Sequence, residues 1–188
     1  MTLLKIIIGA VMVSLFSIIK FSFVTARPEL SSEKSTGFAV VELFTSEGCS
    51  SCPAADDVVA AAAKDYQQNV FVLGFHVDYW NRLGWKDEFS STAYTNRQRE
   101  YANAFSLNSI YTPQAVVNGK TEFVGSDRNK LNRAIKTELN NNTSVNIQLS
   151  SVTSGNTAVS IQYTTDADDK NNLNIALVQL QAVTNVKR

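Results

Sequence analysis

Apolar and polar residues follow patterns that change along the chain, and these changes separate the predicted elements. Residues 38–44 form a nearly continuous apolar run with β-branched members, which is typical of a strand buried on both faces of a parallel sheet. Residues 53–66 are rich in alanine and begin with Pro53, which suits the first turn of a helix. Residues 70–77 form a second apolar run. Strand, helix and strand predict a βαβ unit whose two strands are parallel.

Two further helices are predicted along the chain. In residues 91–105, the side chains that recur at intervals of three and four are mainly aromatic, which indicates a face turned towards the core. Residues 126–139 carry apolar residues at helical spacing, and Ser126 is the expected N-cap. Between residues 78 and 90, aromatic and charged residues are interleaved, and we expect a long loop over an apolar surface.

The remaining patterns predict antiparallel strands. The short apolar runs 115–117 and 121–124 flank Asn118 and Gly119, both of which tolerate the positive φ of a tight hairpin turn. After residue 142, apolar and polar residues alternate over three segments, which predicts a β appendage with one apolar face. These segments centre on residues 145–149, 159–163 and 173–177, and a strand-like stretch follows at 182–186. An apolar face on so few strands needs a partner surface, so we expect the appendage at residues 143–188 to be truncated.

Residues 1–26 have the pattern of a cleaved signal peptide. Lys5 precedes a long apolar run, and small residues at the spacing of a cleavage site end at Ala26. A single membrane anchor is the alternative, because the run is almost long enough to span a bilayer, but Lys20 interrupts it near one end. We expect cleavage after Ala26, a polar leader over residues 27–37, and a secreted or periplasmic protein that is not bound to a membrane.

Composition excludes several classes of function. The 188 residues are 44% apolar and 18% charged, which is typical of a globular domain. Lys and Arg number 17 and Asp and Glu also number 17, and no basic run is present, so binding to nucleic acid is not expected. Two cysteines and one histidine are too few for a structural zinc site within one chain.

The chemistry is concentrated in the motif Cys49-Ser50-Ser51-Cys52, which lies between a predicted buried strand and a predicted helix. Backbone N–H groups and the dipole at a helix start stabilise a thiolate and lower the pKa of the first cysteine. We therefore predict that Cys49 attacks and Cys52 resolves in thiol-disulfide exchange. Metal binding and a structural staple are the alternatives, although a bridge that closes so short a loop removes little entropy from the unfolded chain.

His76 and Asp78 are the next candidates. They follow the strand predicted to lie parallel to the one that delivers Cys49, at the edge where ligands bind in open α/β sheets. His76 is suited to carrying a proton to the leaving thiolate, or to joining Cys49 and Cys52 as a third ligand for copper or zinc. The alternative is that His76 and Asp78 only anchor the following loop through hydrogen bonds.

The order strand, CxxC, helix, strand, helix, strand, hairpin strand, helix resembles the thioredoxin fold. Thr112-Pro113 stands directly before the third strand, where thioredoxin-like proteins place a cis-proline beside the dithiol. More closely, the chain resembles, over residues 38–186, the secreted bacterial thioredoxin-like family known as the domain of unknown function DUF 1223. The strings that carry this resemblance are VELFTSEGCSSCP from Val41, HVDYW from His76, LGWKD from Leu83 and YTPQ from Tyr111.

The resemblance implies an α/β, thioredoxin-like fold with a central mixed sheet flanked by helices over residues 38–142. It also implies that Cys49 is an exposed nucleophile, that Cys52 is the resolving thiol, and that Pro113 positions an incoming substrate chain. A cis bond before Pro113 would turn the backbone of Thr112 towards the sulfurs, so that its N–H and C=O could pair with an extended peptide.

Tyr111 and Trp80 complete the expected substrate-binding set, with core packing under the loop as the alternative for Trp80 and Trp85. The predicted function is a secreted or periplasmic thiol-disulfide oxidoreductase that needs no dissolved cofactor. Its expected partners are protein thiols or disulfides and a redox partner protein. The alternatives are a copper or other metal carrier that uses the two cysteines and His76, and a non-catalytic binding module.

Overall fold

The computed structural model describes residues 37–142, 145–155, 157–168, 170, 172–180, 182 and 186. The predicted signal peptide and the predicted leader up to residue 36 lie outside these residues. Within the described part of the chain, no helix has both the length and the apolar character needed to cross a membrane.

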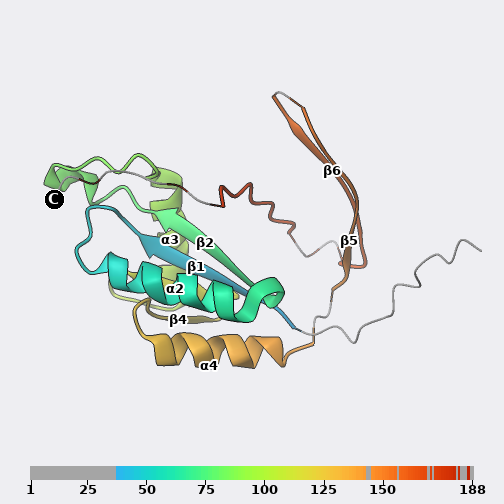
Figure 1. Cartoon of the computed structure of the whole chain (residues 1–188), viewed down its shortest axis with the longest axis horizontal. Helices are drawn as coiled ribbons and strands as arrows, with labels where there is room; N and C mark the ends of the chain where they lie inside the picture. The colour runs from blue at the N-terminus through green and yellow to red at the C-terminus, as the bar shows by residue number, and fades with distance from the viewer. Residues whose placement is uncertain are drawn as a thin grey trace, which may run out of the picture. The chain divides into compact units, whose positions relative to one another are not determined.

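A four-stranded mixed sheet forms the centre of the domain (Figure 1). Its strands, in spatial order, are β2 (Val70–His76), β1 (Ala39–Thr45), β3 (Gln114–Val117) and β4 (Thr121–Val124). β1 and β2 are parallel, whereas β3 runs antiparallel to both β1 and β4. The predicted βαβ unit and the predicted hairpin at Asn118 and Gly119 are therefore confirmed.

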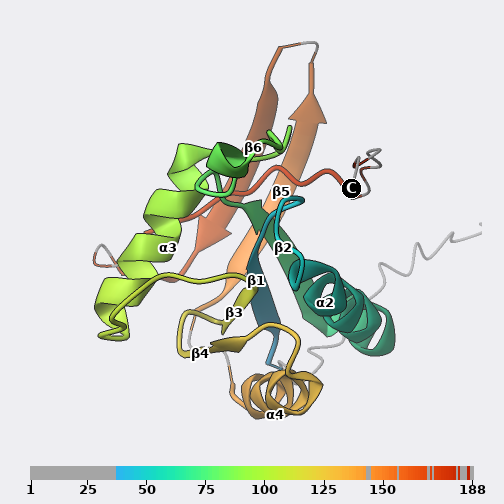
Figure 2. The same ribbon diagram turned by 90° about the vertical axis from the view of Figure 1, so that its left-hand side faces the viewer.

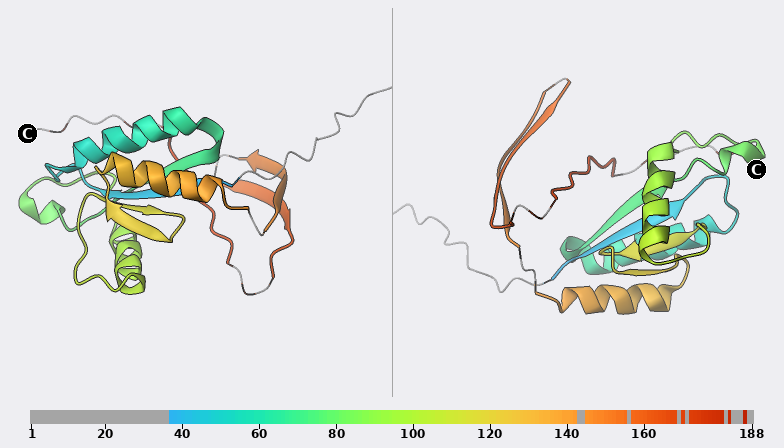
Figure 3. Two further views of the ribbon diagram at one scale, coloured as in Figure 1. Left: turned by 90° about the horizontal axis from the view of Figure 1, so that it is seen from below. Right: turned by 180° about the vertical axis from the view of Figure 1, so that it is seen from behind.

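Helices cover the two faces of this sheet unequally (Figures 2 and 3). α2 (Cys52–Tyr66) and α4 (Arg128–Leu139) lie on one face, and α3 (Thr92–Ala104) lies on the other. Two short 3-10 helices, η1 (Gln67–Asn69) and η2 (Asn81–Leu83), follow α2 and β2. The layered arrangement explains the continuous apolar runs, because the central strands are covered on both sides.

Successive residues of β1 belong to different clusters of the core. Val41 and Leu43 pack in the larger cluster with residues of α2 and α4. Phe44 packs in a smaller cluster on the opposite face, where Tyr101 of α3 lies against it with ring centroids 6.0 Å apart. This alternation follows from the two-residue period of a strand.

The start of α4 differs by one residue from the prediction. The N-cap is Asp127, whose side chain accepts a hydrogen bond from the N–H of Lys130 at 2.9 Å, and not Ser126. A turn that continues from β4, with the N–H of Asp127 bonded to the carbonyl of Val124, includes Ser126 and delays the helix.

Asn118, in the β3–β4 turn, has φ +48° and uses its whole side-chain amide. Its Oδ1 accepts from the N–H of Val40 at 2.6 Å. Its Nδ2 donates to the carbonyl of Phe38 at 2.9 Å and to Oε2 of Glu138 at 2.8 Å. The turn residue therefore connects β1 and α4.

The appendage contains a hairpin of β5 (Ile147–Ser154) and β6 (Val159–Thr165). A bulge between Leu149 and Ser151 leaves Leu149 opposite Tyr163 and Val152 opposite Ile161, so both apolar pairs share one face. The third predicted strand, at residues 173–177, is wrong for this structure: residues 172–179 have no strand pairing with any described residue. Alternation alone does not make a strand without a partner edge. Of the stretch 182–186, residues 183–185 lie outside the described residues.

Candidate functional site

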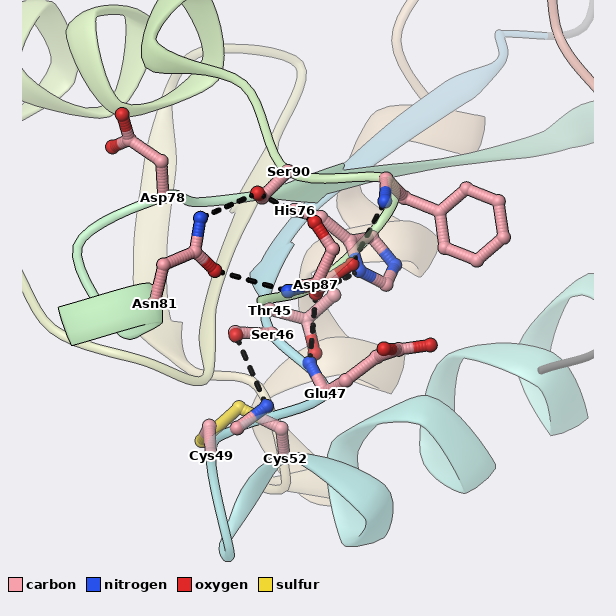
Figure 4. Close-up of polar contacts among 12 residues, drawn as sticks. Thr45, Ser46, Glu47, Cys49, Cys52, His76, Asp78, Asn81, Asp87 and Ser90 are labelled. Atoms are coloured by element: carbon pink, nitrogen blue, oxygen red, sulfur yellow. Dashed lines mark hydrogen bonds and ion pairs between the residues drawn. A yellow bond between two sulfur atoms is a disulfide. The ribbon is translucent and has the colours of Figure 1, made fainter. Parts of the chain in front are cut away.

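A disulfide joins Cys49 and Cys52 between the end of β1 and the start of α2, with the Cα atoms 5.4 Å apart (Figure 4). α2 begins at Cys52 and has Ser51 as its N-cap, so Cys49 precedes the helix N-terminus. N–H groups and the dipole at a helix start favour a thiolate at such a position. The Ser51 hydroxyl makes no capping bond and lies 3.5 Å from Sγ of Cys49. Because a disulfide sulfur carries no proton, the hydroxyl is the donor in this contact.

Both cysteines are buried, with exposed fractions of 2% for Cys49 and 1% for Cys52. The exposure that the family resemblance implied for Cys49 is therefore wrong for this oxidised state, and its role as the nucleophile stays a prediction. The chain turns after β1, where the N–H of Cys49 donates to the carbonyl of Ser46 at 3.1 Å, and Trp80 lies against the adjacent Gly48. Ser50 and Ser51 are the exposed residues of the motif.

His76, at the end of β2, pairs with a residue that sequence analysis had not assigned to the site. Its Nδ1 lies 2.7 Å from Oδ2 of Asp87, whose side chain is completely buried. The same Oδ2 accepts from the N–H of Glu47 at 2.9 Å, and Oδ1 accepts from the N–H of Phe89 at 2.9 Å. A carboxylate accepts hydrogen bonds, so this pairing places a proton on Nδ1 of His76.

Asp87 thereby links β2 to the turn that precedes the disulfide. Glu47 is two residues before Cys49, and Figure 4 shows Asp87 between His76 and Glu47. In the sequence, Asp87 is the last residue of LGWKD, which is one of the four strings that carry the family resemblance. Its partners Glu47 and His76 are 40 and 11 residues away in sequence, so no local pattern separates this buried acid from its exposed neighbour Glu88.

Asp78 does not join this group. Its carboxylate accepts hydrogen bonds from the hydroxyls of Thr92 and Thr95, the latter at 2.6 Å. These hydrogen bonds, from Thr92 first and Thr95 second, lower the pKa of Asp78. Figure 4 shows the side chain pointing away from the disulfide and towards α3. Asp78 therefore anchors the start of α3, which is the alternative role considered from the sequence.

Asp56 lies on α2, one turn after Cys52, and accepts a hydrogen bond from the Thr45 hydroxyl at 3.3 Å. Burial raises the pKa of Asp56, and the Thr45 hydrogen bond and the charge of His76 oppose that rise. Sequence reasoning did not assign Asp56 to the site. The spacing was a usable signal, because helix residues four apart lie on the same face.

Trp80 connects the disulfide loop to the loop before β3. Its indole N–H donates to Oγ1 of Thr112 at 2.8 Å. A Cβ placed on Gly48, next to Cys49, would lie 3.4 Å from Cβ of Trp80. Trp80 is half-buried and packs against the Phe44 cluster, which is the packing role considered from the sequence, and its contact with substrate stays a prediction. The indole N–H of Trp85 donates to Oε2 of Glu47 at 2.8 Å.

The Tyr111–Pro113 segment is held from several sides. The peptide bond between Thr112 and Pro113 is cis, as the resemblance implied. The carbonyl of Pro113 accepts from the N–H of Gly125 at 3.0 Å, and a Cβ built on Gly125 would meet Cβ atoms of both Ala55 and Pro113. Pro113 is therefore close to the first turns of α2. The backbone N–H and C=O of Thr112 form no hydrogen bond with any described residue.

The ligand set expected for a metal carrier is not assembled. Among the residues that the structure describes, no three His, Cys, Asp or Glu side chains converge on a point that could hold a metal ion. The sulfurs of Cys49 and Cys52 are bonded to each other, and Nδ1 of His76 faces Asp87. In this oxidised form, Cys49, Cys52 and His76 do not form a metal site.

Comparisons with known proteins place this chain in a family without assigning a function. No curated protein matches it. Among solved structures, it is similar to protein AGR_C_4864 from Agrobacterium tumefaciens, with 42% identity, a TM-score of 0.49, and coverage of 53% of this chain and 44% of that one. It is also similar to HBP35 of Porphyromonas gingivalis, with 17% identity, a TM-score of 0.46, and coverage of 72% and 44%. The chain thus spans less than half the length of these two structures. A family model matches residues 40–188, and the chain belongs to this family, DUF1223, which is described as a protein of unknown function.

Proposed function

We propose that this protein is a thiol-disulfide oxidoreductase with a thioredoxin-like fold, in which Cys49 attacks and Cys52 resolves. The observation that carries the proposal is the closed Cys49–Cys52 disulfide between the end of a buried strand and the start of α2. Support for the fold comes from the strand order β2-β1-β3-β4, with a parallel pair on one side and an antiparallel hairpin on the other.

In the reducing direction, the Cys49 thiolate attacks one sulfur of a substrate disulfide and forms a mixed disulfide, and the other substrate sulfur leaves as a thiolate that takes up a proton. Cys52, deprotonated, then attacks Cys49 Sγ, which forms the internal disulfide and releases the second substrate thiolate. Two electrons pass from the protein to the substrate. The oxidising direction is the reverse of these steps, and the relative stability of the Cys49 thiolate sets the preferred direction.

The surrounding residues supply position rather than bond-making. His76 and Asp87 anchor the turn that carries Cys49, through the hydrogen bond from Glu47 to Asp87. The open N–H and C=O of Thr112 are suited to pairing with an extended substrate, because a peptide that adds as a strand uses such backbone groups. Trp80 and Tyr111 hold this segment in place.

The expected substrates are protein thiols or disulfides, with a second redox protein that returns the cysteine pair to its starting state. The signal-peptide pattern of residues 1–26 supports a secreted or periplasmic location, where disulfides persist. No dissolved cofactor enters the exchange, because the two cysteines carry both electrons.

A redox titration tests this proposal. The protein is equilibrated against mixtures of reduced and oxidised glutathione, and the free thiols are counted after acid quenching. We expect one reversible two-electron transition, which disappears in a Cys49→Ser and Cys52→Ser double variant. A disulfide that stays closed at every ratio of glutathione, and also with excess dithiothreitol, would sink the oxidoreductase assignment and leave a structural staple in a binding module.

A further inference from the structure

A closed ring of hydrogen bonds lies under the Tyr111–Pro113 segment and connects three elements of the fold. Gln98 of α3 donates through Nε2 to the carbonyl of Tyr111 at 2.6 Å and to Oε1 of Gln114 at 2.9 Å. Gln114 of β3 donates to Oε2 of Glu122 at 3.0 Å, and the Tyr111 hydroxyl donates to the same oxygen at 2.6 Å. Tyr111 is therefore fixed at its carbonyl and at its phenol.

We propose that Gln98 is a positioning residue for substrate, which holds the carbonyl of Tyr111 so that the next peptide unit, Thr112, presents its N–H and C=O to an extended chain. The proposal rests on the proposed function and identifies the part of the fold that sets recognition of a peptide backbone.

The bonds around Thr112 support this role. The preceding carbonyl, of Tyr111, accepts a hydrogen bond from Gln98, and the following carbonyl, of Pro113, accepts one from the N–H of Gly125. The side chain of Thr112 is taken by Trp80. Within the Tyr111–Pro113 segment, Thr112 is the residue whose backbone N–H and C=O both lack a hydrogen-bond partner among the described residues. A backbone unit with fixed neighbours and free groups is pre-organised for pairing, which lowers the entropy that binding must offset.

The chemistry of Gln98 points to a specific use of its amide. The residue has an exposed fraction of 0%, and its Nε2 makes two hydrogen bonds while its Oε1 makes none with any described residue. Burying an amide whose oxygen lacks a protein partner opposes folding, and an apolar side chain would avoid that cost. The two donated bonds are thus the contribution that only an amide makes at this position.

The experiment uses a Cys52→Ala background in the full chain, in which Cys49 reacts once with an activated disulfide. The Cys49 thiolate attacks the sulfur of a cysteine peptide blocked with pyridine-2-thiol, the Cys49–peptide disulfide forms, and pyridine-2-thione leaves and is followed by its absorbance. The small probe 2,2′-dithiodipyridine reacts at the same sulfur without a peptide backbone. The measured quantity is the ratio of the two rate constants.

We expect Gln98→Met to lower the peptide-to-small-probe ratio about fivefold, the size of one lost hydrogen bond. Glu100→Gln, an exposed change on the same helix, should leave the ratio unchanged. A second variant, Gln98→Glu, keeps the shape but has no N–H donor. Its ratio should recover relative to the parent as falling pH protonates the introduced carboxylate beside the carbonyl of Tyr111, the amide of Gln114 and the phenol of Tyr79, which a purely structural defect would not reproduce.

A backbone-methylated peptide that cannot pair with Thr112 provides the remaining arm. In the parent, the methylated peptide should lower the peptide-to-small-probe ratio by the same factor as Gln98→Met does with the unmodified peptide. Combining the two changes should lower the ratio no further, because both remove the same interaction. An unchanged ratio in both Gln98 variants, or a methylated peptide that reacts as fast as the unmodified one, overturns the inference. The redox titration fails or succeeds separately, because trapping by an activated disulfide needs no reversible exchange.

Discussion

His76 and Asp87, 11 residues apart in sequence, meet through a contact of 2.7 Å between Nδ1 and Oδ2. This pairing closes the long loop after β2, and the same carboxylate oxygen holds the N–H of Glu47. The loop is therefore secured at the point where it passes the turn that leads to the disulfide.

Replacing Asp87 should destabilise the protein substantially. Asp87→Ala removes the acceptor of the N–H groups of Glu47 and Phe89 and of the imidazole of His76. We expect the free energy of unfolding to fall by about 3 kcal/mol, measured by urea denaturation of the oxidised protein. Glu88→Ala, at the exposed neighbouring position, is the control and should change stability by less than about 0.5 kcal/mol. A loss of unfolding free energy in Asp87→Ala as small as that in Glu88→Ala would show that the buried carboxylate is dispensable.

Gly125 should not tolerate a side chain. A Cβ there would lie 2.7 Å from Cδ1 of Leu43, 3.2 Å from Cβ of Ala55 and 3.4 Å from Cβ of Pro113. Overpacking of this kind costs about 1–3 kcal/mol, so Gly125→Ala should lower the midpoint of thermal unfolding. Gly74→Ala, where a Cβ would meet no atom within 4 Å, is the matched control and should be neutral or slightly stabilising. If Gly125→Ala melts at the same temperature as the control, then Leu43 and Ala55 move aside for the added methyl group without a measurable cost.

The ion pair between Lys120 and Glu138 should make part of the stability depend on pH. The Lys120 hydrogen bond, at 2.8 Å, is the leading cause that lowers the pKa of Glu138. A carboxyl whose folded pKa is lowered stabilises the fold above its unfolded pKa, and this contribution is lost as pH falls through the folded pKa. Glu138→Gln should therefore be less stable than the parent at pH 7, and the gap should close in acid below the ordinary range of Glu. Urea titrations at several pH values measure this, and a gap independent of pH would contradict it.

The two cysteines should behave differently as single variants. Cys49 precedes the N-terminus of α2 and contacts the Ser51 hydroxyl, whereas Cys52 is the first residue of the helix. Cys52→Ser should accumulate mixed disulfides with partner proteins in extracts, because the attacking thiol remains and the resolving thiol is gone. Cys49→Ser should accumulate few. Non-reducing gels with and without dithiothreitol detect these complexes, and equal trapping by both variants would reverse or erase the assigned roles.

The order of elements could be predicted from the sequence because it depends on local patterns. Continuous apolar runs indicated β1 and β2, an alanine-rich segment that begins with proline indicated α2, helical spacing indicated α3 and α4, and Asn118-Gly119 indicated the hairpin. Errors arose where the outcome depends on contacts distant in sequence. The N-cap of α4 moved to Asp127 because the turn from β4 continues through Ser126, and residues 173–177 lack a strand partner among described residues.

The candidate site could be predicted only in part. The CxxC motif was found because it carries its own chemistry, and the segment with Pro113 was found through the family resemblance. Asp87 was missed because its role comes from tertiary hydrogen bonds. Gln98 lies in the helix predicted over residues 91–105, but nothing in the sequence indicated that its amide would reach Tyr111. The burial of Cys49 was also unforeseen, because burial depends on the packing of segments that are distant in sequence, such as Trp80 against Gly48.

The side chain of Asn118 substitutes for a peptide group that the chain does not contain. With one oxygen and one nitrogen bonded to the N–H of Val40 and the C=O of Phe38, it reproduces the donor and acceptor of a further rung on β1. The hydrogen bonding along β1 therefore extends past the end of β3, because the side chain of Asn118 pairs with the backbone at the start of β1. Another turn sequence with the same backbone shape, such as Gly-Gly, would preserve the bend and still shorten the sheet.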